Sequence, residues 1–388
     1  MTKIKKSFLI LLLGALAFAI FSGGNLPYSG FYCFMFLFFG ALIFSYLTKK
    51  NFSLVLVVDN HYAYVGDEIK TVVKFYNDSL IPMPYVRVYS EFLKKGVDKY
   101  RGDIISLKLN SNRFLDKKVR FNVRGVYDFG KVSCRCEDLF GIVSWKKDYK
   151  TTGMCKVFPK IYNLDNIEIK GADETSYSSR GVAIYNKFSE NNETVKNIRE
   201  YRVGDNRKKI NWKVTAKHGK IYIKEYESSQ CSQIHLFLDF RSKPFQHDTA
   251  GEMEEELVEF FLSLVRYLEN YNGRIKISII GQEKKNFIVC DDKDFEVVNS
   301  YMVEHFSGGE GIVENYMSGI LEYMSRKNSI AIVTSDIGKD NINYIIALAG
   351  RGFKVTLFYL TSGFEAGNKL IREAVNCGIA CYNIREIR

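Results

Sequence analysis

Two long apolar runs open the chain. Residues Phe8 to Phe21 are apolar or small throughout, and Phe31 to Leu47 forms a second run rich in Phe and Leu. A simple membrane span needs about 20 such residues, and flanking residues can extend both runs to that length. A polar loop, SGGNLPYSG, separates the runs. The pattern therefore predicts a two-helix transmembrane hairpin over residues 1–50.

Alternating apolar and polar positions follow, as in strands with one buried face. Phe52 to Val58 and Ile69 to Phe75 show this period, and Val65-Gly66-Asp67 is a turn signal between them. Further short segments of the same kind continue to Phe158. Several short strands at this spacing predict an all-β sandwich of Ig-like type over residues 51–160.

The second half of the chain shows a different pattern. Residues 161–196 are polar and are expected to form a long, poorly packed connection. From residue 228 to 388, buried strands alternate with amphipathic helices, which predicts a doubly wound, mostly parallel α/β sheet. The expected strands are 234–238, 275–280, 329–333, 354–359 and 379–382, and the expected helices are 252–268, 295–305, 313–324, 342–349 and 365–375.

A dense motif lies where these halves meet, within residues 197–227. Its first part reads NIREYRVGDNRKKINWKVTAK. Gly204 suits a turn and Asp205 suits a helix N-cap, because its carboxylate can accept hydrogen bonds from free amides. Ile210, Val214 and Lys217 have helical spacing, and residues 220–227 alternate as a half-exposed strand does. We expect a turn, a helix and a strand at a domain junction.

This run resembles the signature of domain-of-unknown-function family number 58, with Lys209 in place of an expected arginine. A second segment, Arg124 to Gly141, is similar to the family's R-G-x-Y and D-x-F-G elements. The resemblance implies the order of hairpin, β-domain, motif and a von Willebrand factor A-like domain. The signature residues that we expect to bind a partner are Arg199, Tyr201, Arg202, Gly204, Asp205, Arg207, Ile210, Asn211, Trp212 and Lys213. In the second segment, Tyr127, Asp138 and Phe140 are interpreted as core and turn residues of the β-domain.

Two carboxylates stand at expected strand ends, which in such sheets is where ligands bind. The resemblance implies a metal site there, with D-x-S-x-S after the first strand, a Thr from a Gly-rich loop and an Asp after the fourth strand. Hydroxyl and carboxylate oxygens suit Mg²⁺. Asp239 and Asp336 keep the carboxylates, whereas Arg241 and Lys243 replace the serines and Glu310 stands near the Thr position. Because cations repel a metal ion and can pair with the carboxylates, we expect a degenerate site without stable metal.

The charged residues and the cysteines indicate the membrane topology and the state of the thiols. The net charge is +11, and the first fifty residues contribute five lysines and no acid. Lys3, Lys5 and Lys6 precede the first run and Lys49 and Lys50 follow the second, so the positive-inside rule predicts a multi-pass protein with cytoplasmic soluble domains. Alternatively, the first run is a signal peptide with Ala17-Phe18-Ala19 at its cleavage site. The eight scattered cysteines are expected to be free, mostly buried thiols without zinc spacing.

Three functional hypotheses remain. The chain has no G-x-x-x-x-G-K-[ST] loop, G-x-S-x-G elbow or H-E-x-x-H motif, and we expect no cofactor and no enzymatic activity. The favoured hypothesis is a membrane-anchored interaction or scaffold protein, whose partner the family resemblance suggests to be a MoxR-type AAA ATPase. Nucleic-acid binding by the basic, aromatic motif is a less favoured alternative, which would weaken steeply with salt. An unrecognised enzyme is the third.

Overall fold

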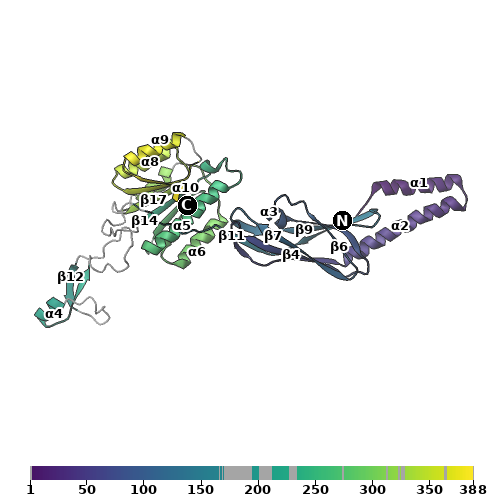
Figure 1. The fold of residues 1–388 in the computed structure, drawn as a ribbon, viewed down its shortest axis with the longest axis horizontal. Helices are drawn as coiled ribbons and strands as arrows, with labels where there is room; N and C mark the ends of the chain where they lie inside the picture. Colours follow the sequence, from purple (N-terminus) through teal and green to yellow (C-terminus); the bar gives the residue numbers. More distant parts are fainter. Residues whose placement is uncertain are drawn as a thin grey trace. The chain divides into compact units, whose positions relative to one another are not determined.

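The chain forms two compact units, Met1–Lys160 and Ile161–Arg388, each described by itself (Figure 1). The computed structural model describes residues 2–165, 167, 169, 195–200, 212–226, 234–272, 275–311, 313–321, 324, 328–361 and 365–387.

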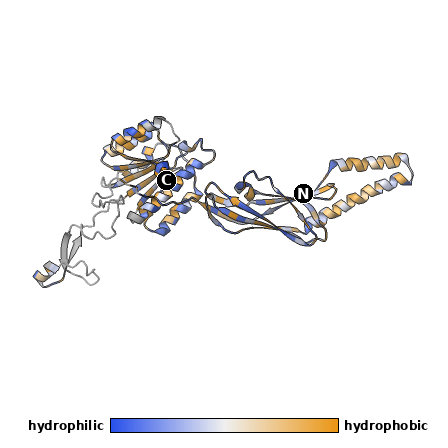
Figure 2. Ribbon diagram, viewed as in Figure 1, coloured by the Kyte–Doolittle hydropathy of each residue, from blue (hydrophilic) through white to orange (hydrophobic). Residues whose placement is uncertain are grey.

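Two apolar helices lie side by side in the first unit (Figures 1 and 2). Helix α2 (Asn25–Lys50) has 26 residues and is long and apolar enough to cross a membrane, whereas α1 (Lys6–Ser22) is a shorter apolar helix. The expected polar loop is mostly helical, since only Gly23 and Gly24 separate α1 from α2. Pro27 does not prevent this, because the first amides of a helix have no intrahelical partner to lose.

Three small sheets make up the rest of the first unit, and their order brings distant segments together. A five-stranded sheet has the order β1-β10-β9-β5-β6, and two three-stranded sheets have the orders β2-β4-β7 and β3-β11-β8. Short helix α3 (Glu91–Gly96) follows β5. The strands are β1 (Thr2–Ile4), β2 (Phe52–Val58), β3 (Tyr62–Tyr64), β4 (Glu68–Asn77), β5 (Met83–Ser90), β6 (Asp103–Leu107), β7 (Ser111–Arg120), β8 (Gly125–Asp128), β9 (Lys131–Glu137), β10 (Val143–Lys150) and β11 (Met154–Phe158).

One hydrophobic core joins these sheets. Alternate residues of β2 and β4 are buried in it, as their period of two requires. The N-terminal strand β1, which the sequence pattern did not indicate, pairs with the start of β10. Cys134, Cys136 and Cys155 are buried, and burial raises the pKa of Cys134 and Cys136 to about 12. None of the described cysteines forms a disulfide, but Cys33, Cys290 and Cys377 are exposed, so the expectation of mostly buried thiols was wrong.

A six-stranded sheet organises the second unit. Its order is β16-β15-β14-β17-β18-β19, and all neighbours are parallel except the edge pair β15–β16. The sequence analysis missed the edge strand β16 because the strand begins with two lysines and only its last residue, Val289, is buried. The strands are β14 (Ile234–Asp239), β15 (Ile275–Ile280), β16 (Lys284–Val289), β17 (Ser329–Thr334), β18 (Lys354–Tyr359) and β19 (Ala380–Asn383).

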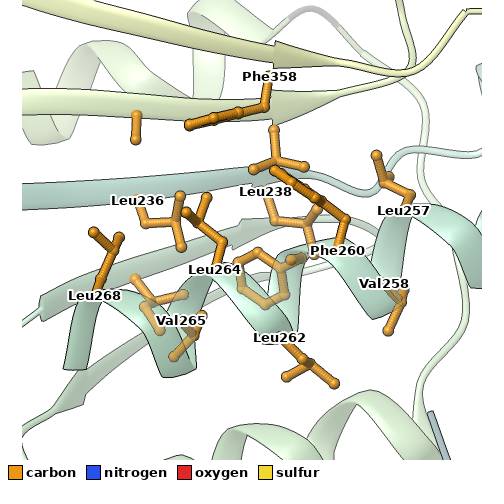
Figure 3. Close-up of a cluster of buried hydrophobic side chains, with 14 of the residues drawn as sticks. Leu236, Leu238, Leu257, Val258, Phe260, Leu262, Leu264, Val265, Leu268 and Phe358 are labelled. Carbon is orange, nitrogen blue, oxygen red and sulfur yellow. The ribbon is translucent and has the colours of Figure 1, made fainter. Parts of the chain in front are cut away.

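Helices cover both faces of this sheet. Alternate residues of β14 point to opposite faces, so Leu236 and Leu238 join the core under α5 and α6, while Phe237 joins the core under α7, α8 and α9. Figure 3 shows the α5 side chains against β14 and Phe358. The helices are α5 (Glu252–Asn272), α6 (Asp292–Glu304), α7 (Val313–Leu321), α8 (Lys339–Gly350), α9 (Glu365–Asn376) and the terminal α10 (Ile384–Ile387).

The segment after residue 160 packs better than its polar composition suggested. Leu164, Ile167 and Ile169 are buried in the core under α5, and the Tyr162 amide donates to the Ser263 hydroxyl at 3.1 Å. The start of the expected loose connection is therefore part of the α/β core, and the rest of that connection lies outside the described residues up to 194.

The signature motif is described only at its ends. β12 (Val195–Glu200) pairs antiparallel with β13 (Tyr222–Tyr226), and α4 (Trp212–His218) lies between them in sequence. The division of the chain at residue 160 places these elements in the second unit. The expected helix and strand occur at α4 and β13, whereas the expected turn at residues 201–211 lies outside the described residues.

Candidate functional site

The candidate site lies at the carboxyl end of the α/β sheet, where its two central strands end. β14 and β17 are parallel neighbours and are buried along their whole length. Asp239 is the last residue of β14, Thr334 is the last residue of β17, and Asp336 follows two residues later. Parallel register brings their side chains to one edge, at the point where helices leave for opposite faces.

Arg241 connects the two carboxylates. Its Nε donates to Asp239 Oδ1 and its Nη2 to Asp239 Oδ2, both at 2.7 Å, which is a bidentate pair. Nη2 also lies 3.1 Å from Asp336 Oδ2, and Nη1 donates to the Gly311 carbonyl at 2.5 Å. The Arg241 side chain is only 4% exposed. The guanidinium therefore occupies the space between the carboxylates.

Other groups complete the hydrogen bonding of Asp239. Thr334 Oγ1 donates to Asp239 Oδ2 at 2.8 Å, and Asn341 Nδ2 reaches the same oxygen at 3.3 Å. Asn341 also donates to the Asp336 carbonyl at 3.0 Å, and the Gly338 amide donates to Asp336 Oδ1 at 3.1 Å. Both oxygens of Asp239 are thus bonded, which a buried carboxylate requires.

A Gly-rich loop, residues 307–311, closes the site from the side. Ser242 donates to the Gly309 carbonyl through its amide at 3.2 Å and through its hydroxyl at 2.9 Å. The Gly308 amide donates to the Phe240 carbonyl at 3.0 Å. Gly309 has a φ of +86°, and a Cβ there would lie 2.5 Å from the Gly281 carbonyl oxygen. Glycine is therefore required for this close approach.

The charges of the site favour the ionised arginine. Burial alone would lower the pKa of Arg241, but the hydrogen bonds and charge of Asp239, with those of Asp336, raise its pKa above the usual value. Arg241 is therefore a permanent cation within the pair of carboxylates. Chemically, this arrangement is a closed ion-pair network rather than an open ligand set.

The five residues at the expected degenerate metal site have different environments in the structure. Asp239, Arg241 and Asp336 come together, whereas Lys243 and Glu310 are exposed. Arg241, not Lys243, makes the expected pairing with the carboxylates. Among the described residues there is no group of three or more His, Cys, Asp or Glu side chains that could hold a metal.

Three participants were missed by the sequence analysis. Thr334 directly follows the expected strand 329–333, and its hydroxyl donates to Asp239. Asn341 lies in the first turn of α8, where no pattern distinguishes it from a surface residue. The Gly311 carbonyl is a backbone group, which a sequence cannot single out.

Among its described residues, the signature motif presents an exposed aromatic side chain. Trp212, the first residue of α4, is 70% exposed. Arg199 is placed in β12 and Lys213 in α4. The other expected binding residues lie outside the described part of the chain: Tyr201, Arg202, Gly204, Asp205, Arg207, Ile210 and Asn211.

The fold and site define a multidomain protein with an N-terminal apolar helix, extensive β-sheets and a C-terminal α/β unit. Residues 197–358 match the model of a family described as "Protein of unknown function DUF58". This match confirms the resemblance drawn from the signature run, over that part of the chain. A Bacillus subtilis protein described as "Uncharacterized protein YeaD" is 21% identical over 345 residues, which cover 86% of this chain and 83% of the relative.

Solved structures show weaker similarity. The CARDB domain of a Pyrococcus furiosus protein is 16% identical and covers 27% of this chain and 86% of its own length, with a TM-score of 0.19. Proximal thread matrix protein 1 of the mussel byssus is 15% identical and covers 40% of this chain and 44% of its own length, with a TM-score of 0.29. These scores carry no argument about the fold.

Proposed function

We propose that the protein is a membrane-anchored, non-enzymatic interaction protein. In this proposal α1 and α2 form a two-span anchor, and the β-domain is an Ig-like sandwich. The C-terminal unit is a von Willebrand factor A-like domain that meets its partner on the cytoplasmic side. The basic residues at both ends of the helical hairpin support this orientation.

The single observation that carries the proposal is the closed network around Asp239. General acid–base catalysis and metal binding both need carboxylate oxygens that are free to take a proton or an ion. Here Arg241, Thr334 and Asn341 use both oxygens of Asp239. An arginine held in this way fixes the shape of the sheet edge, which suits a surface for recognition rather than a reaction centre.

The positions of these residues also support the von Willebrand factor A-like assignment. That fold is expected to place its metal ligands after the first strand, on a Gly-rich loop and after the fourth strand. Asp239 ends the first strand of the sheet, the 307–311 loop packs on Ser242, and Asp336 follows the fourth strand. Arg241 lies at their centre, where such a site would hold its ion.

A MoxR-type AAA ATPase is the proposed partner, as the family resemblance suggests. The signature motif is the proposed docking face, because Trp212 is a large aromatic side chain left 70% exposed. Exposed Trp and Arg side chains are common energetic centres of protein interfaces. Arg202 of the same run is the proposed charged partner of Trp212 in docking.

The test is affinity purification of the full chain from detergent-solubilised membranes after mild crosslinking. Wild type would be compared with Trp212→Ala and with Val297→Ala, a matched control that truncates a 57% exposed apolar residue on α6. We expect an AAA ATPase with wild type and with Val297→Ala, and its loss with Trp212→Ala. Recovery of no ATPase with any of the three would contradict the proposed partnership.

A further inference from the structure

The loop between β9 and β10 presents two apolar side chains to the outside. Leu139 is 65% exposed and Phe140 is 67% exposed. The loop is a fixed turn, since the Asp138 amide donates to the Val143 carbonyl and the Gly141 amide donates to the Asp138 carbonyl, both at 3.1 Å. Asp138 Oδ1 also accepts from the Val143 amide at 3.3 Å. These hydrogen bonds therefore hold Leu139 and Phe140 in exposed positions.

The base of this loop packs against the apolar helices. Ile142 and Val143 are buried in one cluster with Ala41 of α2, and Phe8, Leu37, Phe38 and Leu42 pack against that cluster. The Lys5 amide, just before α1, donates to the Ile142 carbonyl at 2.9 Å. Leu139 and Phe140 thus project beside the point where α1 begins.

Helix α2 is fixed to the sheets, so the loop cannot swing away from the helices. The Trp145 indole N–H donates to the Thr48 hydroxyl at 2.9 Å, and both groups are buried. The Tyr149 hydroxyl and the Lys147 ammonium donate to the Phe52 carbonyl at 2.6 and 3.1 Å. These bonds hold the end of α2 and the start of β2 against β10.

The helix lengths place the loop at a defined level. Helix α1 has 17 residues, and the stretch of α2 from Asn25 to Ala41 matches it. Both stretches are about 25 Å long at 1.5 Å per residue, which is close to the thickness of the hydrocarbon core. If these stretches span the bilayer, the lysines before Phe8 and the tip of the β9–β10 loop lie at one membrane surface.

We propose that the β9–β10 loop is a second membrane contact, in which Leu139 and Phe140 insert at the boundary between lipid headgroups and acyl chains. The proposal rests on the membrane anchoring proposed above. Insertion of leucine and aromatic side chains at this boundary is favourable, and lysine side chains can reach the headgroups. Lys5 lies beside the turn, because a Cβ on Gly141 would be 3.2 Å from Lys5 Nζ. Phe140 is a turn residue, as the sequence analysis expected, and the proposal adds a membrane contact to that position.

The test uses the full chain reconstituted into phosphatidylcholine vesicles with ordinary or brominated acyl chains, which quench nearby tryptophan. Phe140→Trp is compared with Leu80→Trp, each after subtraction of the wild-type signal. Leu80 is a matched control, since it is 85% exposed in the loop after β4. The neighbouring Asp78 amide bonds to the Asn51 carbonyl, so Leu80 lies level with the end of α2, about 15 Å beyond Ala41 by helical rise. Flotation of the vesicles reports anchoring separately.

We expect the added fluorescence of Phe140→Trp to fall about twofold in brominated vesicles, and that of Leu80→Trp to change little. Leu139→Trp should behave as Phe140→Trp does. Protein that floats with the vesicles but shows equal quenching at positions 140 and 80, or none at 140, overturns the loop insertion and leaves the anchor intact. Protein that does not float contradicts the anchor, and with it this inference.

Discussion

Arg241 is a charge held inside the protein by the charges around it. Its side chain and that of Asp239 are 4% and 0% exposed, and three hydrogen bonds join Arg241 to Asp239 and Asp336. A buried pair of this kind adds little net stability when it is intact, because desolvation offsets the attraction. Removal of one partner is costly, since the other charge remains buried without compensation.

We therefore predict that Arg241→Ala lowers the free energy of unfolding of the second unit by about 3–5 kcal/mol. Arg385→Ala is the matched control, because Arg385 makes a bidentate pair with Glu256 on the surface and its side chain is 52% exposed. That change should cost no more than about 1 kcal/mol. Urea midpoints from pulse proteolysis of the detergent-solubilised chain measure both, and equal losses would argue against a structural role of the buried pair.

Buried His235 is expected to make the stability of the second unit depend on pH. It is 7% exposed and lies 2.9 Å from the Ser278 hydroxyl, which donates to Asn286 Oδ1 at 2.7 Å. Burial, helped by the charges of Lys276 and Lys284, lowers its pKa from 6.5 to about 4. Between these values the unfolded state binds a proton that the folded state does not. Stability contributed by neutral His235 is therefore present above pH 6.5 and lost as the pH falls towards 4.

We predict that wild type loses up to about 3 kcal/mol more than His235→Gln over this pH window. The amide of glutamine keeps a polar partner for Ser278 but does not titrate. The measurement is the urea midpoint of both proteins at a series of pH values. Parallel pH profiles of wild type and His235→Gln would exclude His235 as the source of the acid sensitivity.

Among the helices and strands, some follow from the local sequence pattern and others form only through pairing with a neighbour. The buried strands β14, β15, β17 and β18 were predicted to within a residue or two, because short, mostly apolar segments of strand length favour buried strands. β16 was not predicted, because an edge strand has one partner and can remain polar. β1 was not predicted, because three residues are too few to show a period and only pairing with β10 makes them a strand.

The 307–311 loop gives a prediction at this scale. Gly309→Ala places a Cβ 2.5 Å from the Gly281 carbonyl oxygen and 2.9 Å from Gln282 Cα, at a positive φ. Backbone atoms cannot move aside as a flexible side chain can, so we expect a loss of at least about 2 kcal/mol. Gly350→Ala in the last turn of α8 is the control. A Cβ there meets no atom within 4 Å, and helix propensity should make this change neutral or stabilising by up to about 1 kcal/mol. Thermal unfolding midpoints of the two variants should shift in opposite directions or differ clearly in size.

The distribution of lysines around the two apolar helices predicts which side of the membrane each part of the molecule occupies. The lysines lie before α1 and after α2, and the turn at Gly23–Gly24 has no basic residue. A two-span anchor with this distribution places both soluble units in the cytoplasm. A cleaved signal peptide would instead remove α1 and leave α2 as the single span.

We predict that a cysteine introduced at Gly24 reacts with a membrane-impermeant maleimide added to intact cells, whereas Cys377 in the second unit does not. Cys377 is exposed, so only the membrane would protect it. Permeabilised cells should label both sites, which is the control for reactivity. Labelling of Cys377 in intact cells would contradict the proposed orientation. A mature N-terminus immediately after Ala19 would support signal-peptide cleavage.

The order of the parts and the type of most elements can be predicted from the sequence without a structure. Period, run length and turn residues are local properties, and they distinguish an apolar helix, a half-buried strand and an α/β alternation without knowledge of contacts. The sequence also predicted that Asp239, Arg241 and Asp336 lie near one edge of the sheet, because the carboxyl ends of parallel strands meet at that edge.

The neighbours of these residues, in contrast, are set by the tertiary fold. It selected Arg241 over Lys243 as the cation between the carboxylates, and it added Thr334 and Asn341 from separate segments. It also set Leu139 and Phe140 beside the apolar helices, through packing of Ile142 on Ala41. The contacts of Asp239 with Thr334 and Asn341, and of Ala41 with Ile142, join residues about a hundred positions apart. Their geometry follows from strand order and side-chain packing, which no local pattern encodes.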